Sequence, residues 1–334
     1  MPTMRRNPQA GFSLPELLIA MAIMLMISGA AVTALLKMQG AQATIWNRTQ
    51  MHSGIRGATE VLQQEVGQAG RISLPLTSAG VAYTVTLGSA VTVTGSNLVT
   101  IASTKTLGDK TEGMFNGQKL LIGTGNNQET VTVSADPTAT QITATFANTH
   151  SAGEPVLALG AFGTGIVPPL ASPSVYAPTG STFTYANGSK GDVLKLYGDI
   201  NADGNMVYIE YTCDTLTSHN LYRNVMAWNT AALSKPAVSA SKVLLSNVMG
   251  NPGTTPCFTY QTALVGGAIY VTDVAITLTV QTQLIDPVTK QFQRQTKALL
   301  NVSPRNTFNA WQMASLGISK RLQPMPPSIA ALLP

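Results

Sequence analysis

The sequence has few charged residues. Only 10% of its 334 residues are Asp, Glu, Lys or Arg, while 44% are hydrophobic. A typical soluble domain has about 25% charged residues, so neutral polar side chains must cover most of this surface. This composition excludes a charge-rich disordered chain and a coiled-coil rod. It is typical of an exported β-rich protein that is long enough for two modest domains. The net charge of +5 is too small to indicate nucleic acid by itself.

Cysteine and the usual catalytic motifs are also scarce. Cys213 and Cys257 are the only cysteines, which is too few for a disulfide scaffold, and they lack the C-x-x-C spacing of a zinc or redox site. The three histidines form no H-E-x-x-H pattern, and the sequence contains no G-x-S-x-G elbow or phosphate-binding glycine loop. We therefore expect no enzymatic activity and no required cofactor.

The N-terminus carries the strongest pattern. Residues 1–11 are polar, with Arg5 and Arg6 as their only charged side chains, and residues 12–36 form an apolar run that contains a single acid. As a helix this run spans about 37 Å, enough to cross a hydrocarbon core of about 30 Å. The arginines predict a cytoplasmic N-terminus and an exported body. The run is longer than the apolar core of about 7–15 residues in an ordinary signal peptide, so we expect the span to be retained.

Glu16 is the single acid within the apolar run. A carboxylate inside a membrane-spanning helix costs about 2.5–3.5 kcal/mol, so such residues usually have a partner and a function. Alternatively, Glu16 lies in the headgroup zone near the start of the helix, where the helix dipole favours an acid and Pro15 fits the first turn. The residues alone leave both readings open.

Residues 11–16, GFSLPE, followed by an apolar helix, resemble the class III signal of type IV prepilins and pseudopilins. The resemblance implies that prepilin peptidase cleaves between Gly11 and Phe12 and that the new Phe12 amine is N-methylated. It also implies that Glu16 of an incoming subunit pairs with the N-terminal ammonium of its neighbour during assembly. The alternative is a plain signal anchor in which these residues match by coincidence.

The helical pattern continues beyond the apolar run. Residues 37–69 are mostly polar outside an apolar stripe with mostly three- or four-residue steps, and Gly70 is a natural helix stop. The stripe consists of Met38, Ala41, Ile45, Met51, Ile55, Ala58, Leu62, Val66 and Ala69. We expect one helix of about 55 residues, with a transmembrane half over 12–36 and a periplasmic amphipathic half over 37–70. Such a helix packed on a β domain resembles the pilin fold, and its ending resembles that of PilW-like minor pilins.

The remaining chain is rich in short alternating segments of Val, Ile, Thr and Tyr, which predict strands. Examples in the first half are Lys119–Ile122 and Gln141–Phe146, and the best strands of the second half are Asp192–Leu196, Met206–Tyr211, Ala268–Gln283 and Phe292–Val302. We predict an α+β, pilin-like fold in which the helix packs on an antiparallel β-sheet head. Residues 80–160 form a β-rich insertion or simply part of the pilin sheet, and 161–189 form a Gly/Pro/Ser loop. Residues 190–306 resemble the pilin-type β domain of PilW-like proteins, and 307–334 are a C-terminal extension without a predicted role.

Residues 199–210, DINADGNMVYIE, match the spacing of a calcium-binding loop. The candidate ligands are Asp199, Asn201, Asp203, Asn205 through its backbone carbonyl, and Glu210. The flanking segments read as strands rather than helices, which departs from an EF-hand and weakens the assignment of Glu210. The alternative is a tight β-turn in which Asp, Asn and Gly serve backbone geometry alone.

Two further predictions follow from export. Cys213 and Cys257 would face an oxidising compartment, so we expect a disulfide between them rather than two buried thiols. Beyond Asp286 all charged side chains are basic, but aromatic residues are few and no nucleic-acid fold signature is present. We therefore expect a solvated basic face rather than a nucleic-acid site.

Taken together, these features predict a structural minor pilin of a type IV pilus. Its expected partners are prepilin peptidase, other major and minor pilins and the inner-membrane assembly platform. The precursor would be a single-pass inner-membrane protein that moves to the periplasm and the pilus. The alternatives are a pseudopilin of type II secretion and an uncleaved, membrane-anchored adhesion or binding module.

Overall fold

The computed structural model describes residues 13–72, 74, 85–102, 113–138, 140–169 and 187–334. Its described residues divide into two compact units. One contains the residues up to His52 together with Thr282–Gln293, and the other contains Ser53–Gln281 and Arg294–Pro334. The fold is α+β, as predicted, with a long N-terminal helix followed by antiparallel sheets.

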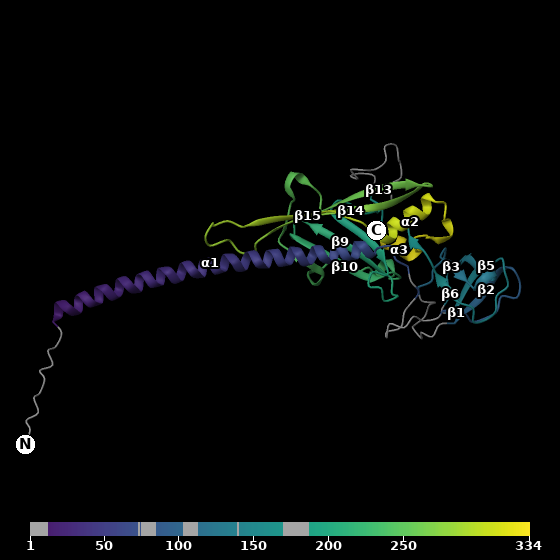
Figure 1. The fold of residues 1–334 in the computed structure, drawn as a ribbon, viewed down its shortest axis with the longest axis horizontal. Coiled ribbons are helices and arrows are strands. Elements are labelled where there is room, and N and C mark those ends of the chain that lie inside the picture. Colours follow the sequence, from purple (N-terminus) through teal and green to yellow (C-terminus); the bar gives the residue numbers. More distant parts are fainter. Residues whose placement is uncertain (1–12, 73, 75–84, 103–112, 139, 170–186) are drawn as a thin grey trace, which may run out of the picture. The chain divides into compact units, whose positions relative to one another are not determined.

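Helix α1 runs from Leu14 to Gln68 (Figure 1). It ends where Gly70 adopts a φ of +81°, a conformation that glycine reaches without a steric penalty. The second half of the predicted stripe, from Ile55 to Ala69, is buried against the head. The first half is different: Met38 and Ile45 are exposed. The predicted stripe is therefore buried from Ile55 onward.

Two antiparallel sheets form the main part of the head. The first has the order β11-β10-β9-β8, with β8 at Val193–Gly198, β9 at Val207–Asp214, β10 at Asn220–Ala227 and β11 at Val243–Ser246. The second is built on the long strand β14, Ala268–Gln281, which pairs with β12 (Val248–Met249), β13 (Phe258–Val265) and β15 (Arg294–Val302). Both faces of the first sheet are covered: fully buried Tyr197 and Tyr208, which are register partners, lie in one core cluster, and fully buried Tyr211 lies on the opposite face, which contacts α1.

Six short strands between Thr86 and Ala158 form two small sheets with a core of their own, made of Val, Leu, Ile and Phe side chains. One sheet has the order β1-β2-β5, with β1 at Thr86–Leu87, β2 at Gly95–Ala102 and β5 at Gln141–Phe146. The other has the order β4-β3-β6, with β3 at Lys119–Ile122, β4 at Glu129–Thr132 and β6 at Val156–Ala158. That this segment is an insertion relative to a pilin stays a prediction.

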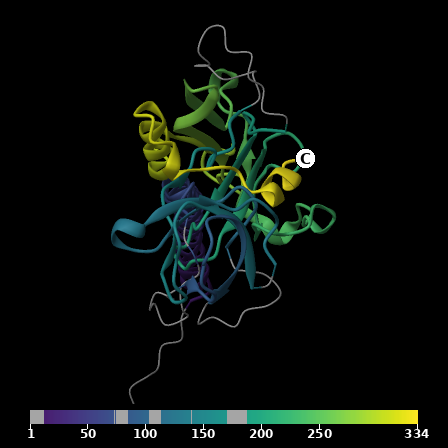
Figure 2. The ribbon, with the colours of Figure 1, turned by 90° about the vertical axis from the view of Figure 1, so that its right-hand side faces the viewer.

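The C-terminal residues, which sequence reasoning could not place, are part of the head. Helix α2, Arg305–Ser315, contacts β13 and β14, and Figures 1 and 2 both draw it in yellow beside these green strands. Strand β16, Leu322–Gln323, pairs in parallel with β7, Ala161–Phe162. In helix α3, Pro327–Leu332, the side chains of Ile329 and Leu332 are fully buried in a core cluster with Phe115 and Tyr208.

Candidate functional site

The start of α1 places Glu16 in the first helical turn. Its carboxylate accepts hydrogen bonds from the backbone N–H of Ser13 at 3.4 Å and from the Ser13 hydroxyl at 3.3 Å. This is one half of a capping box, in which a glutamate three residues into the helix satisfies the N–H of the capping serine. Glu16 is exposed, as are the apolar side chains that follow it. Gly11 and Phe12, the predicted cleavage and methylation residues, lie outside the described residues.

The helix that carries Glu16 is suited by length and composition to cross a membrane. Among the described residues, α1 is the one helix that is long and apolar enough to do so. None of its most apolar segment of 18 residues is buried in the protein. The Leu, Ile, Met and Val side chains that are exposed along the run, from Leu14 to Leu36, are each more than half exposed. The head therefore does not bury these side chains in the described part of the chain, and a lipid or protein environment is needed to cover them.

A second glutamate fixes the other end of α1 to the first sheet. The Glu65 carboxylate is buried and accepts hydrogen bonds from Arg223 Nε at 3.0 and 3.1 Å, from the Arg223 terminal nitrogen and from the Tyr211 hydroxyl. Tyr211 lies on β9 and Arg223 on β10, and these two residues are partners in the antiparallel register. We call Glu65, Tyr211 and Arg223 the helix clasp.

The electrostatics of the helix clasp follow from burial. Burial, the neighbouring Glu65 charge and the hydrogen bond to it together raise the pKa of the Tyr211 hydroxyl far above its ordinary value. For Arg223, burial opposes the charged form, but the hydrogen bond and charge of Glu65 outweigh it and raise the pKa of the guanidinium. Tyr211 therefore stays a neutral donor and Arg223 a cation, the two states that a buried carboxylate requires.

The C-terminus of α1 is held by groups distant in sequence. The Asn306 amide donates to the carbonyls of Gln68 at 3.0 Å and Ala69 at 3.3 Å, which lack partners within the helix. The Gly70 N–H donates to the Tyr197 carbonyl at 2.9 Å. Asn306 is the second residue of α2, so its bonds join the end of α1 to the start of α2. These bonds orient the helix exit relative to the sheet.

The proposed calcium ligands are only partly brought together. Asp199 is buried; its carboxylate accepts the Asp203 N–H at 3.0 Å and lies 3.6 Å from Arg71. Asp203 is exposed and accepts the Asn205 N–H at 2.8 Å. Glu210 lies on β9, where the Tyr208 hydroxyl and Lys235 each bind its carboxylate at 3.0 Å. Across the described residues, no group of three or more His, Cys, Asp or Glu side chains is arranged to hold a metal ion.

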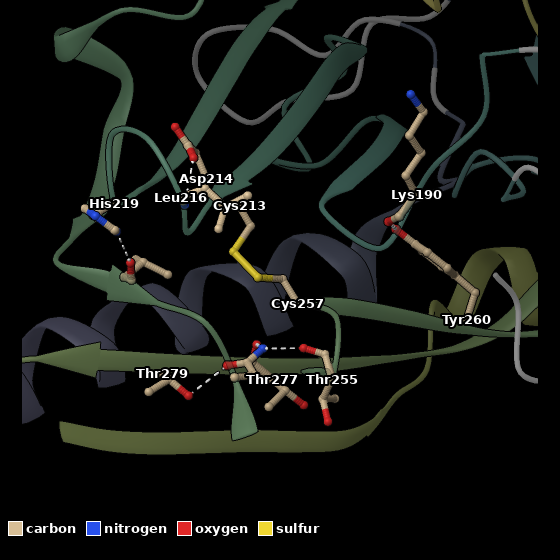
Figure 3. The surroundings of a disulfide bond; sticks show 12 residues. Lys190, Cys213, Asp214, Leu216, His219, Thr255, Cys257, Tyr260, Thr277 and Thr279 are labelled. Carbon is tan, nitrogen blue, oxygen red and sulfur yellow. Dashed lines mark hydrogen bonds between the residues drawn. A yellow bond between two sulfur atoms is a disulfide. The ribbon is translucent and has the colours of Figure 1, made fainter. Parts of the chain in front are cut away.

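Cys213 and Cys257 form the predicted disulfide (Figure 3). Cys213 lies in β9, and Cys257 immediately precedes β13, so the bond links the two main sheets of the head. The two Cα atoms are 6.5 Å apart, within the usual range for a disulfide. Both residues are buried. The bond closes a long segment, which makes it a stabilising link within the head.

Sequence reasoning missed a buried histidine in the small sheets. His150 Nδ1 lies 2.6 Å from Glu154 and Nε2 lies 2.9 Å from Glu129, and His150 itself is almost fully buried. Burial opposes the charged imidazole, but the two carboxylates outweigh it and raise the pKa of His150. The H-x-x-x-E spacing of His150 and Glu154 was the available signal. Glu129 could not be recognised because strand pairing brings it there.

The basic residues near the C-terminus are spread over several elements. Lys297 on β15 donates to the Thr59 hydroxyl of α1 at 2.8 Å, so it contributes to packing of the helix. Arg305 begins α2, and Lys320 and Arg321 lie in a short 3-10 turn at Ser319–Arg321. These placements do not test the expectation that nucleic acid is not a partner.

Comparison with known proteins identifies one part of the chain. Residues 6–32 match the prokaryotic N-terminal methylation motif, the type IV pilin-like signal. No match to a curated protein and none to a solved structure was found. The motif implies processing by prepilin peptidase and association with pilins, and together with the long apolar helix it indicates membrane anchoring. The chain therefore carries the N-terminal signal of a type IV pilin-like or pseudopilin-like protein, joined to a β-rich head.

Proposed function

We propose that this protein is a structural minor pilin of a type IV pilus, of the PilW-like type. The precursor is held in the inner membrane by α1, cleaved between Gly11 and Phe12, methylated on Phe12 and incorporated to prime assembly or to form the tip. Its role is mechanical rather than catalytic. Its partners are prepilin peptidase, the inner-membrane assembly platform and other pilins.

The observation that carries this proposal is the methylation motif at residues 6–32 together with the environment of Glu16. Within the described residues, the hydrogen bonds of the Glu16 carboxylate come from Ser13, a neutral neighbour in its own turn. A carboxylate in an apolar helix costs about 2.5–3.5 kcal/mol in lipid. A cationic amine from another subunit would offset that cost, and this requirement favours ordered addition of subunits.

The head supports the same role because α1 is built into it. The helix clasp and the Asn306 cap join the helix to β9, β10 and the start of α2. A pull on the helix is therefore transmitted to the sheets through charged and neutral hydrogen bonds as well as apolar packing. Such anchorage suits a subunit that is extracted from a membrane and held in a filament.

Two alternative functions would use the same N-terminal signal or helix. A type II secretion pseudopilin would use the same signal and helix. An uncleaved adhesion or binding module would use α1 only as an anchor. Deleting the pilus genes or the secretion genes in turn, and testing which deletion prevents incorporation of this protein, separates the pilus from the pseudopilus.

N-terminal sequencing of the membrane-extracted protein tests processing. We expect a mature start at methyl-Phe12, whereas retention of Met1 would support the uncleaved anchor. Assembly is tested with Glu16→Ala, which we expect to accumulate in the membrane without entering filaments. Glu60→Ala is the matched control, because Glu60 lies on the same helix, is exposed and pairs only locally with Arg56 at 2.8 Å. If Glu16→Ala protein enters filaments as efficiently as the wild type, the proposed pairing is wrong.

A further inference from the structure

An exposed apolar hairpin tip lies beside α1 just beyond its apolar run. The tip consists of Thr282–Gln293, the loop between β14 and β15, and it belongs to the same compact unit as the first part of α1. Figure 1 draws this loop alongside the helix. Its Leu284, Ile285, Val288 and Phe292 side chains are 45–66% exposed. Four large, exposed apolar side chains on one short loop form an unusual surface, because soluble proteins rarely expose contiguous apolar patches.

The tip is held against α1 by its only acidic residue. Asp286 is buried and accepts hydrogen bonds from the Thr44 hydroxyl at 2.9 Å and from the Val288 N–H at 2.8 Å. Pro287 lies close to Gly40, where an added Cβ would come within 3.9 Å of its ring. Gln293 at the base of the tip accepts a hydrogen bond from Arg48. The acid therefore faces inward, and the apolar side chains are left outside.

The place of these contacts along α1 sets the depth of the tip. Gly40 lies four residues beyond Leu36, the end of the apolar run, which corresponds to about 6 Å along the helix axis. The headgroup layer on each side of a bilayer is about 5–7 Å thick. When the apolar run spans the membrane, Pro287 is therefore at the level of the lipid headgroups. Exposed Trp46 lies on the same part of α1, and Trp is enriched at this interface.

The charges around the tip fit an anionic lipid surface. Residues 37–52 and 282–293 contain three cations, Lys37, Arg48 and Lys290, and one carboxylate, the inward-facing Asp286. An apolar surface bordered by cations binds a membrane by burial of apolar area and by attraction to acidic headgroups. A second copy of the chain would offer the same basic border and meet it with like charge.

We propose that the hairpin tip Thr282–Gln293 is a second membrane-contact site, which inserts Leu284, Ile285 and Val288 into the outer headgroup region of an anionic lipid bilayer. The inference rests on the proposed function in one respect, because it requires α1 to span the membrane before assembly. The tip then restrains the rotation and tilt of α1 in the membrane-held subunit. Its release from lipid is a step that extraction into a filament has to include.

The test uses the full chain in vesicles of phosphatidylglycerol and phosphatidylethanolamine. An environment-sensitive fluorophore is attached to one introduced cysteine at a time, since the native cysteines are joined in a disulfide. Val288→Cys reports on the tip, Leu233→Cys on an exposed apolar site elsewhere in the head, and Ile27→Cys on the middle of the apolar run. Spin-labelled lipids quench probes in the bilayer, whereas iodide quenches probes in water.

We expect lipid quenching of the probes at positions 27 and 288, and iodide quenching of the probe at position 233. Replacing Leu284 and Ile285 by Gln should remove lipid quenching at position 288 while leaving it unchanged at position 27. If the probe at 288 responds to iodide as the one at 233 does, the inference is overturned and the proposed function stands. Protection at 288 from both quenchers would show that protein covers the tip, which also overturns the inference. Loss of lipid quenching at position 27 would overturn the inference and the proposed membrane stage together.

Discussion

Replacing Arg223 by Met removes the cation of the helix clasp and leaves Glu65 in place. Glu65 is only 5% exposed, so water cannot replace the lost guanidinium. Removing one partner of a buried ion pair typically costs about 3–5 kcal/mol, because the remaining charge is uncompensated. We therefore expect Arg223→Met to lower the free energy of unfolding of the head by about 3–5 kcal/mol.

Glu65→Gln should destabilise the head less than Arg223→Met does. The amide oxygen can still accept the Tyr211 hydroxyl, and the Arg223 side chain is 31% exposed and can be hydrated. The expected cost is about 1.5 kcal/mol, the low end for a hydrogen bond to a charged group. In the double variant Glu65→Gln/Arg223→Met no buried charge is left unpaired. Its cost should fall below the sum of the single costs by about 2–3 kcal/mol.

Urea unfolding of the detergent-solubilised chain, followed by near-ultraviolet circular dichroism, measures these differences. Arg56→Met is the matched control, because Arg56 makes an exposed pair with Glu60 on the same helix. We expect this control to match the wild type within error. An Arg223→Met cost below about 1 kcal/mol, or a Glu65→Gln cost larger than that of Arg223→Met, would refute the role given to the buried charge.

Three further outcomes are expected. Because the pKa of His150 is raised in the folded state, its contribution to stability is complete below pH about 6.5 and is lost as the pH rises through the folded pKa. The pKa values of Glu129 and Glu154 are lowered, so the contribution of these carboxylates is lost at acid pH. The thermal midpoint should therefore fall on the alkaline side, and His150→Gln should flatten that limb; an unchanged limb in the variant would contradict the assignment. Cys213→Ala/Cys257→Ala should cost about 3–4 kcal/mol in urea unfolding, since the bond joins residues 44 apart, and a wild-type value would contradict this. Thermal melting with millimolar Ca²⁺ tests the calcium hypothesis for residues 199–210: a rise in the midpoint that is lost in Asp203→Ala would support it, and no shift in the wild type would remove it.

The long helix could be predicted because its signals are local. An unbroken apolar run and a stop at Gly70 define α1 to within two residues, and the pattern at residues 11–16 was recognisable without a fold. Strand β5 alternates between polar and apolar residues, and both β3 and β5 have the bounds that the sequence predicts. Strand β10 was missed because Arg223 and Asn224 interrupt its apolar alternation. Those residues serve tertiary contacts, to Glu65 and to the Pro236 carbonyl.

Contacts between distant residues could not be predicted. The helix clasp joins groups that are 146 and 158 residues apart, and nothing in the spacing of Glu65, Tyr211 and Arg223 indicates that they meet. Residues 307–334 follow the segment that resembles a pilin domain, and the sequence alone predicts no role for them. In the structure Pro327 starts α3, and Ile329 and Leu332, three residues apart, face the core. A short amphipathic helix beginning at a proline was the signal available there.

Two glutamates on α1 differ in how the charge of a carboxylate away from water is compensated. Glu65 is buried in protein and has its cation and its hydroxyl donor within the chain. Glu16 belongs to an apolar segment, and the hydrogen bonds described for it come from uncharged Ser13. Neutralising Glu65 should therefore weaken the isolated protein. Under the proposed function, neutralising Glu16 should leave the unfolding of the isolated head unchanged and weaken the association with another subunit, whose terminal amine is the proposed charge partner.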